Sequence, residues 1–194
     1  TAIAGAMAID DYAVLGISMG TSLAGGYINT DGCVTGWINE LAFVPVDYRE
    51  GISIDEWSGD AGCGVQYFSQ QGVGRLLPLS GIEADDSIGL PEKLEVVQEK
   101  MKQGDERAAA LYSTIGTCFG YTIAHFADFY EFRHLLFLGR VSSGEGGGII
   151  MREARKVLDL EFPELSKQIV FQTPDEKTKR HGQAIAAASL PKIN

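Results

Sequence analysis

The first quarter of the chain alternates short apolar runs with turns rich in glycine. An apolar run at 13–17 leads into the small-residue stretch 20–26, and a second run at Tyr27 and Ile28 leads into the polar turn 29–32. Two further short apolar runs follow at 33–37 and 41–46, and Pro45 places the end of the last one at a sheet edge or a bulge. The pattern predicts four short strands in an antiparallel meander.

Helical spacing replaces this pattern in the middle of the chain. Apolar residues from 65 to about 71 fit a short helix, which glycines then interrupt. Pro91 suits the first turn of a second helix, which is expected to end at Gly104. The longest helical pattern covers 106–130 and carries aliphatic and aromatic residues on one broad face, so this helix is expected to be largely buried.

The last third of the chain returns to alternating strands and helices. The continuous apolar run 135–138 is typical of a central strand covered on both faces. A Gly/Ser-rich loop at 139–148 follows it, then a helical pattern at 149–158, a short strand at 169–171 and an alanine-rich helix at 181–190. The order predicts one α/β domain whose mixed sheet begins with the antiparallel meander and continues α-β-α-β-α.

Composition and charge narrow the possible classes. A chain of 194 residues with 45% hydrophobic content buries a sizeable core and fits one large domain or one lobe of a bigger protein. The net charge of −10 argues against a general binder of nucleic acids or anionic membranes. The three cysteines, Cys33, Cys63 and Cys118, form no C-x-x-C pair, which indicates reduced thiols. With no apolar run of roughly 18 residues and no basic leader, a cytoplasmic protein is expected.

Both glycine-rich stretches are candidate ligand sites. In the first, glycines let a ligand approach the backbone N–H groups, and the hydroxyls of Thr21 and Ser22 add donors, which suits a phosphate. A plain tight hairpin explains the same residues equally well. The second, at 139–148, presents backbone N–H groups and a helix N-terminus, where anionic or nucleotide ligands bind. Its alternative is a flexible connection between a strand and a helix.

With both turns placed, the order of elements resembles the C-terminal lobe of the actin, hexokinase and Hsp70 superfamily of ATP-binding proteins, a ribonuclease H-like lobe. Within it, the chain is most similar to the ROK group of bacterial sugar kinases and sugar-responsive repressors, over nearly its whole length. The sequence G-T-S-L-A-G-G at 20–26 resembles the family's G-T-G-I-G-G-G hairpin, which contacts the β- and γ-phosphates. The sequence L-G-R-V-S at 138–142 resembles its adenosine-side L-G-G-G-V-S turn, one residue shorter and with Arg140 where glycine is usual.

The resemblance implies that ATP and Mg²⁺ bind to this lobe. The implied phosphate-binding residues are Gly20, Thr21, Ser22, Gly25 and Gly26, and the implied adenosine-binding residues are Gly139, Ser142, Ser143 and Gly144. Carboxylates near the phosphate turn, at Asp10, Asp11 and Asp31, are candidates to hold hydrated Mg²⁺, although acidic residues in turns are usually only solvated.

The first residues bear on where the catalytic base lies. Residues 1–5 resemble the alanine-rich helix that follows the family's catalytic aspartate, so no catalytic residue is expected in this chain and the base is expected upstream. Residues 1–194 are therefore expected to form a single C-terminal nucleotide-binding lobe of a two-lobe protein, with an N-terminal lobe outside the chain. The expected partners are ATP, a sugar and, as in ROK proteins, a second copy in a homodimer.

The sugar and zinc signatures depart from the family pattern. Asn39 and Glu40 begin the stretch in the place of G-E-x-G-H, which implies that they contact the sugar, but Phe43 replaces the histidine that binds both sugar and zinc. Residues 56–63 stand in the place of C-x-C-G-x-x-G-C and keep only Cys63. Because one thiolate with a serine and a glutamate is a poor tetrahedral set, no structural zinc is expected.

Two function classes remain open. In the first, the chain is the nucleotide-binding lobe of an ATP-dependent sugar kinase, which the retained turn residues favour. In the second, it belongs to a non-catalytic ROK-like sugar-sensing regulator or an orphan relative. Phe43, Arg140 and Val65 favour the second, or a kinase with an unusual substrate, since Val65 stands where the family has another sugar-binding glutamate.

Overall fold

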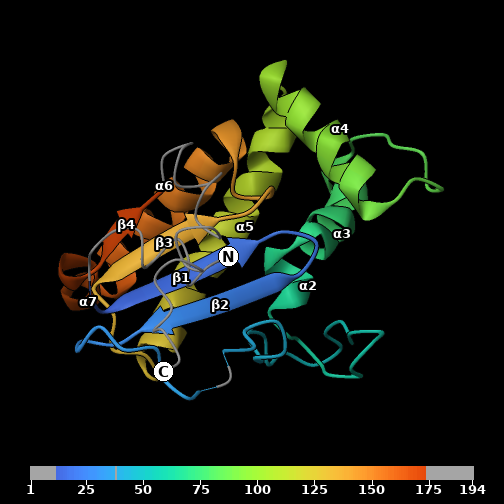
Figure 1. The fold of residues 1–194 in the computed structure, drawn as a ribbon. Coiled ribbons are helices and arrows are strands. Elements are labelled where there is room, and N and C mark those ends of the chain that lie inside the picture. Colours follow the sequence, from blue (N-terminus) through green and yellow to red (C-terminus); the bar gives the residue numbers. More distant parts are fainter. Residues whose placement is uncertain (1–11, 38, 174–194) are drawn as a thin grey trace, which may run out of the picture.

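A four-stranded mixed sheet forms the centre of the computed structural model, which describes residues 12–37 and 39–173 (Figure 1). Strand β1 (Val14–Met19) pairs antiparallel with β2 (Leu23–Ile28) and parallel with β3 (His134–Leu138). Strand β3 in turn pairs parallel with β4 (Val170–Gln172), so the order across the sheet is β2-β1-β3-β4. The predicted mixed α/β class is confirmed.

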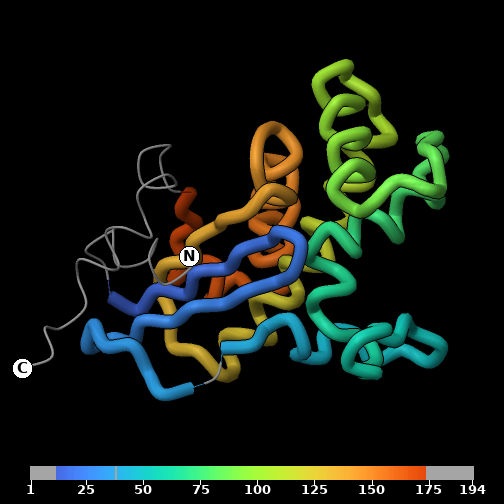
Figure 2. Tube along the Cα trace, turned by 45° about the vertical axis from the view of Figure 1, so that its right-hand side comes forward, coloured from blue at the N-terminus to red at the C-terminus, as the bar shows by residue number. Residues whose placement is uncertain are grey.

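Helices pack on one face of this sheet and extend beyond its edge. They are α2 (Val65–Phe68), α3 (Gln70–Ser80), α4 (Leu90–Lys102), α5 (Glu106–Ala127), α6 (Gly144–Glu161) and α7 (Pro163–Gln168). The long helices α5 and α6 lie side by side behind the sheet in Figure 1. Helix α4 projects past the sheet, and Figure 2 shows it together with the segment 81–89 as a separate protrusion.

The face of the sheet toward α5 carries the main core. Leu15 and Ile17 of β1 and Phe137 of β3 are buried in one cluster with the apolar face of α5. Phe119 of α5 meets Phe137 edge to face at a centroid distance of 5.4 Å. On the other face, Leu136 joins a second buried cluster, so β3 is apolar on both sides, as its continuous apolar run predicted.

Helices α5 and α6 pack closely at Gly116. A Cβ on Gly116 of α5 would lie 2.7 Å from the carbonyl oxygen of Ile150 in α6, so only glycine leaves room for the neighbouring backbone. Gly116 therefore lets α5 pack against α6 and does not interrupt α5.

The predicted meander is wrong beyond its first hairpin. Within the described residues the stretches 33–37 and 41–46 form only single bridges, between Val34 and Ile28 and between Pro45 and Cys63. The apolar residues Leu41 and Ala42 are nevertheless buried. They gain burial by lying against the start of α2, where the N–H of Val65 donates to the carbonyl of Ala42 at 2.9 Å, without forming a ladder.

Several helix boundaries also differ from the predicted ones. Helix α3 continues through Gly72 and Gly74 to Ser80, because these glycines allow close contacts with Tyr67 and Leu90 instead of ending the helix. Helix α6 begins at Gly144, five residues before the predicted 149. The predicted helices at 1–9 and 181–190 lie outside the described residues.

Candidate functional site

The turn after β1 and the turn after β3 lie side by side. Since β1 and β3 are parallel neighbours, both strands end at the same edge of the sheet, on the side of α3 and α4 (Figure 1). The N–H of Val141 donates to the carbonyl of Met19 at 3.0 Å. Gly139 has a φ of 99°, and a Cβ there would lie 2.3 Å from the carbonyl oxygen of Met19. Only glycine permits this junction, which places the two glycine-rich turns in direct contact.

The first turn is shorter than the sequence predicts. It consists of Gly20, Thr21 and Ser22, and the N–H of Gly20 donates to the carbonyl of Ser22 at 2.9 Å. Thr21 and Ser22 are exposed at the tip, so their hydroxyl groups face solvent. Helix α3 is tied to this turn, because the N–H of Gln70 donates to the carbonyl of Gly20 at 2.9 Å.

Gly25 and Gly26, which the sequence places in the turn, lie within β2. They stand opposite Ile17 and Gly16 in the antiparallel ladder. A Cβ on Gly25 would lie 2.7 Å from the side chain of Leu41, so this glycine makes room for the segment that follows the hairpin. Of the five predicted phosphate-binding residues, the structure thus gathers three in the turn and places two in the strand.

The second turn leads directly into α6. The hydroxyl of Ser142 donates to the carbonyl of Leu138 at 2.5 Å, and that of Ser143 donates to the carbonyl of Arg140 at 2.7 Å. Ser143 occupies the N-cap position of α6 without a side-chain capping bond. The first N–H groups of α6, beginning at Gly144, therefore lack a side-chain cap, and the positive end of the helix dipole favours an anion there.

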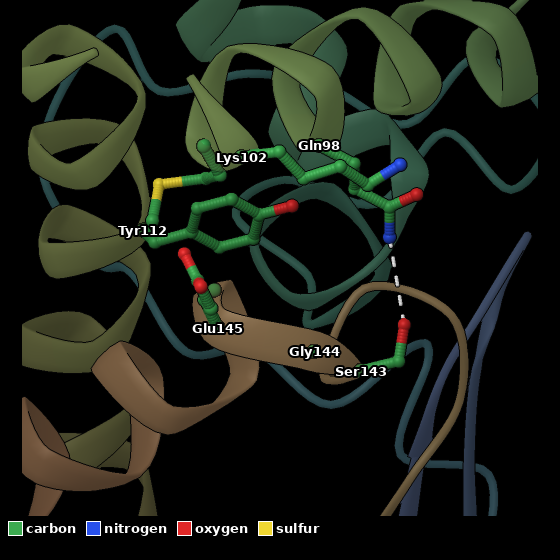
Figure 3. Close-up of a pocket in the computed structure, with 8 residues that line it drawn as sticks. Gln98, Lys102, Tyr112, Ser143, Gly144 and Glu145 are labelled. Carbon is green, nitrogen blue, oxygen red and sulfur yellow. Dashed lines mark hydrogen bonds between the residues drawn. The ribbon is translucent and has the colours of Figure 1, made fainter. Parts of the chain in front are cut away.

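A cavity of about 350 Å³ opens between α4, α5 and the start of α6 (Figure 3). Its lining residues are Gln98, Met101, Lys102, Tyr112, Ser143, Gly144, Glu145 and Gly146. In Figure 3 the ring of Tyr112 lies between α4 and the beginning of α6. This volume falls within the range of small-molecule sites.

Tyr112 has a polar group with no partner at this cavity. Its side chain is fully buried, and its Oη has no hydrogen-bond partner among the residues that the structure describes. Burial raises the pKa of Tyr112 to about 12, so the hydroxyl stays protonated and able to donate. A buried hydroxyl without a partner is costly, and a ligand in the cavity is one way to satisfy it.

Helix α4 is attached to the second turn by side chains of both. The amide of Gln98 donates to the carbonyl of Arg140 at 3.0 Å. It also donates to the hydroxyl of Ser143 at 3.5 Å, the bond drawn as a dashed line in Figure 3. Arg140 itself forms a 2.9 Å ion pair with Glu95. The arginine that departs from the ROK pattern thus connects the turn to α4 at the surface.

The predicted sugar-binding residues lie beside the first hairpin. A Cβ on Gly25 would come within 3.0 Å of the carbonyl oxygen of Asn39, and Glu40 follows at the exposed surface. The Oδ1 of Asn39 is buried and has no hydrogen-bond partner in the described part of the chain. Val65, in the place of the family's second sugar-binding glutamate, is buried. The structure therefore brings Asn39 beside Gly25, one of the two predicted phosphate-binding glycines that lie in β2.

The residues in the place of the zinc site do not fit a zinc ion. Phe43 stacks on Trp57 with a centroid distance of 5.5 Å and an interplanar angle of 26°. The carboxylate of Asp55 accepts the N–H of Ser58 at 2.9 Å, and this bond chiefly lowers the pKa of Asp55. Among residues 12–37 and 39–173, no three His, Cys, Asp or Glu side chains group as a metal site requires. An aromatic stack and a carboxylate-capped turn hold this loop in place of metal ligands.

Sequence reasoning missed the cavity-lining side chains from α4 and α5. Tyr112 fits the apolar face of a buried helix, and nothing in its spacing distinguishes a core tyrosine from one that faces a ligand. Gln98 and Lys102 look like ordinary solvated positions of α4. The one available signal is that a tyrosine, unlike a phenylalanine, brings a hydroxyl into the core.

No protein-family model matches the sequence, and no curated protein matches it. Solved structures do match. A ROK family transcriptional regulator, a homologue of the E. coli MLC protein, has a TM-score of 0.72 and 18% identity over 95% of this chain and 49% of its own. This chain has the ROK fold.

Two sugar kinases with the ROK fold match in the same way. The ROK hexokinase from Thermus thermophilus has a TM-score of 0.70 and 16% identity over 96% of this chain and 61% of its own. The ROK family glucokinase from Streptomyces griseus, solved with glucose and AMPPNP, has a TM-score of 0.66 and 20% identity over 96% of this chain and 65% of its own. The chain thus spans about half to two thirds of the length of these structures. No described helix is long and apolar enough to cross a membrane.

Proposed function

We propose that this chain is the nucleotide-binding lobe of an ATP-dependent sugar kinase, which transfers a phosphoryl group from ATP to a sugar hydroxyl. One observation carries the proposal. Two glycine-rich turns meet at one edge of the sheet, next to a cavity lined by the start of α6, which has no side-chain cap, and by Tyr112, whose hydroxyl has no partner among the described residues. The ROK fold, which sugar kinases share, supports the same reading.

The two parts of the site suit the two parts of a nucleotide. The cavity between α4, α5 and α6 would hold the adenosine, with Tyr112 donating a hydrogen bond and Ser143 and Gly144 in its wall. Gly139 and Ser142, the other two implied adenosine-binding residues, line a neighbouring pocket that shares Ser143 with this cavity. The hydroxyls and backbone of Gly20, Thr21 and Ser22 would contact the phosphates. Mg²⁺, bound to the phosphates, would neutralise the charge that develops during transfer.

The sugar would lie on the other side of the first hairpin. Glu40 and the buried Oδ1 of Asn39 are acceptors for sugar hydroxyls beside Gly25. Phosphoryl transfer also needs a carboxylate that accepts the proton of the attacking hydroxyl. We assign that carboxylate to a second lobe outside this chain, since the matching kinases are longer than the chain and continue beyond the part that it covers.

Calorimetry with AMPPNP and Mg²⁺ tests the nucleotide site directly. We expect one binding event per chain, and weaker binding after Ser143→Trp, which fills the cavity mouth between α4 and α6. Asp128→Asn, at the far end of α5, is the matched control and is expected to bind like the parent. If no adenine nucleotide gives heat or raises the melting temperature, the proposal is wrong.

A non-catalytic sugar-responsive regulator is the second candidate. The stacked Phe43 and the buried Val65 replace two of the sugar contacts that the family resemblance implies, and a transcriptional regulator is among the matching structures. The sequence upstream of residue 1 separates the two candidates. An Asn-Asp pair just before the chain favours the kinase, whereas a DNA-binding helix-turn-helix further upstream favours the regulator.

A further inference from the structure

A second cavity, of about 570 Å³, lies away from both glycine-rich turns, between the loop 53–57 and helix α3. Asp55, Glu56 and Trp57 line it from the loop, and Gln66, Gln71 and Arg75 line it from α2 and α3. It shares no lining residue with the cavity at Tyr112, and neither Asn39 nor Glu40 lines it. Nothing in the proposed kinase chemistry uses it.

The buried amide of Gln66 and the guanidinium of Arg75, an exposed residue, form one wall of this cavity. Gln66 is only 4% exposed, and its Oε1 has no hydrogen-bond partner in the described ranges. Its backbone carbonyl accepts the Nη1 of Arg75 at 3.0 Å, and the guanidinium lies 5.2 Å from the centre of the Tyr67 ring. Arg75 is therefore held in place with further N–H donors to spare, beside an amide acceptor that lacks a partner.

The opposite wall combines an aromatic surface with carboxylates. Trp57 is 82% exposed although Phe43 stacks on it, so its indole is held in position while most of its surface stays accessible. Asp55 is 4% exposed and is fixed by the N–H of Ser58 and by Gln71, which also lines the cavity. Two contacts, a ring stack on Trp57 and hydrogen bonds to Asp55, therefore hold the loop where it faces the cavity.

We propose that this cavity binds a neutral saccharide, with a sugar ring against Trp57 and hydroxyl groups bonded to Gln66, Gln71 and Arg75. A hydroxyl group both donates and accepts, so it matches a wall that mixes carboxylate and amide acceptors with guanidinium donors. Asp55 and Glu56 would repel an anionic ligand, and Arg75 would repel a cationic one. A neutral ligand is therefore favoured. The volume accommodates one or two sugar rings.

The site is independent of the proposed kinase function, because it uses neither the nucleotide cavity nor Glu40. The test titrates the whole chain carrying Glu40→Ala, which removes the sugar acceptor beside the hairpin, with glucose and with maltose in a calorimeter. We expect saturable binding of at least one of the two sugars in this background. Adding Gln71→Ala or Trp57→Ala is expected to weaken it about tenfold, as for loss of one good hydrogen bond or ring contact.

Trp37→Phe is the control, since Trp37 is another exposed indole and lies outside the cavity. It is expected to leave the affinity unchanged, and melting curves verify that each variant folds. Glucosamine and glucose 6-phosphate, which carry opposite charges, are expected to bind more weakly than glucose. The proposal is overturned if neither glucose nor maltose binds, if both cavity variants bind like the parent, or if glucose 6-phosphate binds more tightly than glucose.

Discussion

Tyr112 combines the packing of a core residue with a polar group that the core does not satisfy. Its ring lies against the first turn of α6, where a Cβ on Gly146 would come within 2.4 Å of it. Its hydroxyl contributes no hydrogen bond to the described structure. The residue therefore reduces the stability of the unliganded protein while it supplies a donor to the cavity.

Replacing Tyr112 by phenylalanine is expected to change stability and binding in opposite directions. Without the unsatisfied hydroxyl, the free protein is expected to gain about 1 kcal/mol in its free energy of unfolding. AMPPNP is expected to bind several-fold more weakly, because its hydrogen bond from Tyr112 is lost. Denaturant unfolding measures the first effect and calorimetry the second. If the variant binds AMPPNP with unchanged affinity, Tyr112 does not contact the nucleotide.

The same residue predicts a specific loss of stability in alkali. Its pKa is raised by burial to about 12 in the folded protein, against about 10 in the unfolded chain. Folding therefore favours the protonated form. The part of the free energy of unfolding that depends on protonated Tyr112 is fully present below pH 10. About 2 kcal/mol of it is lost as pH rises from 10 to 12. The free energies of unfolding of the parent and of Tyr112→Phe are expected to diverge in this window, because only the parent loses this stability, so the advantage of the variant grows from about 1 to about 3 kcal/mol if other tyrosines titrate alike in both proteins.

Gly139→Ala tests the junction between the two turns. The new Cβ meets the carbonyl of Met19 at a backbone φ that disfavours alanine, so a cost of about 3 kcal/mol is expected. Gly104→Ala is the matched control, because Gly104 has a φ of 74° but open space around its Cβ position. It is expected to cost only about 1 kcal/mol. Equal costs in denaturant unfolding would show that the turns do not depend on this contact.

At the scale of elements, glycines have opposite roles in α5 and α6. Gly116 of α5 faces the backbone of α6, whereas a Cβ on Gly148 of α6 would have nothing within 4 Å. Gly116→Ala is therefore expected to destabilise the protein by about 2 kcal/mol, through forced separation of the helices. Gly148→Ala is expected to stabilise it by about 0.5 to 1 kcal/mol, because alanine loses less backbone entropy in a helix. Thermal unfolding distinguishes the two signs, and a stabilising Gly116→Ala would contradict the packing.

The loop that replaces the zinc site is expected to be stable without metal. Since Phe43, Trp57 and Asp55 hold it through stacking and hydrogen bonds, EDTA is expected to leave the melting temperature unchanged. Asp55→Ala, by contrast, is expected to lower it. Elemental analysis provides the direct check, and one zinc per chain would contradict the prediction.

For the whole molecule, the proposed division into two lobes predicts binding without turnover. The 194-residue chain is expected to bind AMPPNP but not to phosphorylate glucose, because the proposed proton acceptor lies on another lobe. A coupled assay for ADP release with glucose and ATP measures this, and a protein extended upstream by the proposed second lobe is the positive control. Phosphorylation by the pure 194-residue chain would show that the catalytic carboxylate lies within it.

The sequence by itself determined the class of the fold and most of its elements. The apolar run of β3, the period of α5 and the glycine-rich stretches are local signals, so they predicted a central strand, a buried helix and two turns correctly in kind. Local patterns were insufficient where burial came from a neighbouring segment. Leu41 and Ala42 are buried by lying against the start of α2 and not by pairing in a strand. Gly72 lies inside α3 because the backbone of Tyr67 leaves no room for a side chain there.

Only the tertiary structure decided which residues share a site. Parallel pairing of β1 with β3 brings Met19 to Gly139, and packing of α4 and α5 against α6 gathers Gln98, Tyr112 and Ser143 around one cavity. These residues are distant in sequence, and no spacing rule connects them. Whether a tyrosine hydroxyl is satisfied depends on the atoms that surround it, and those atoms come from elements whose positions the chain specifies only once it has folded.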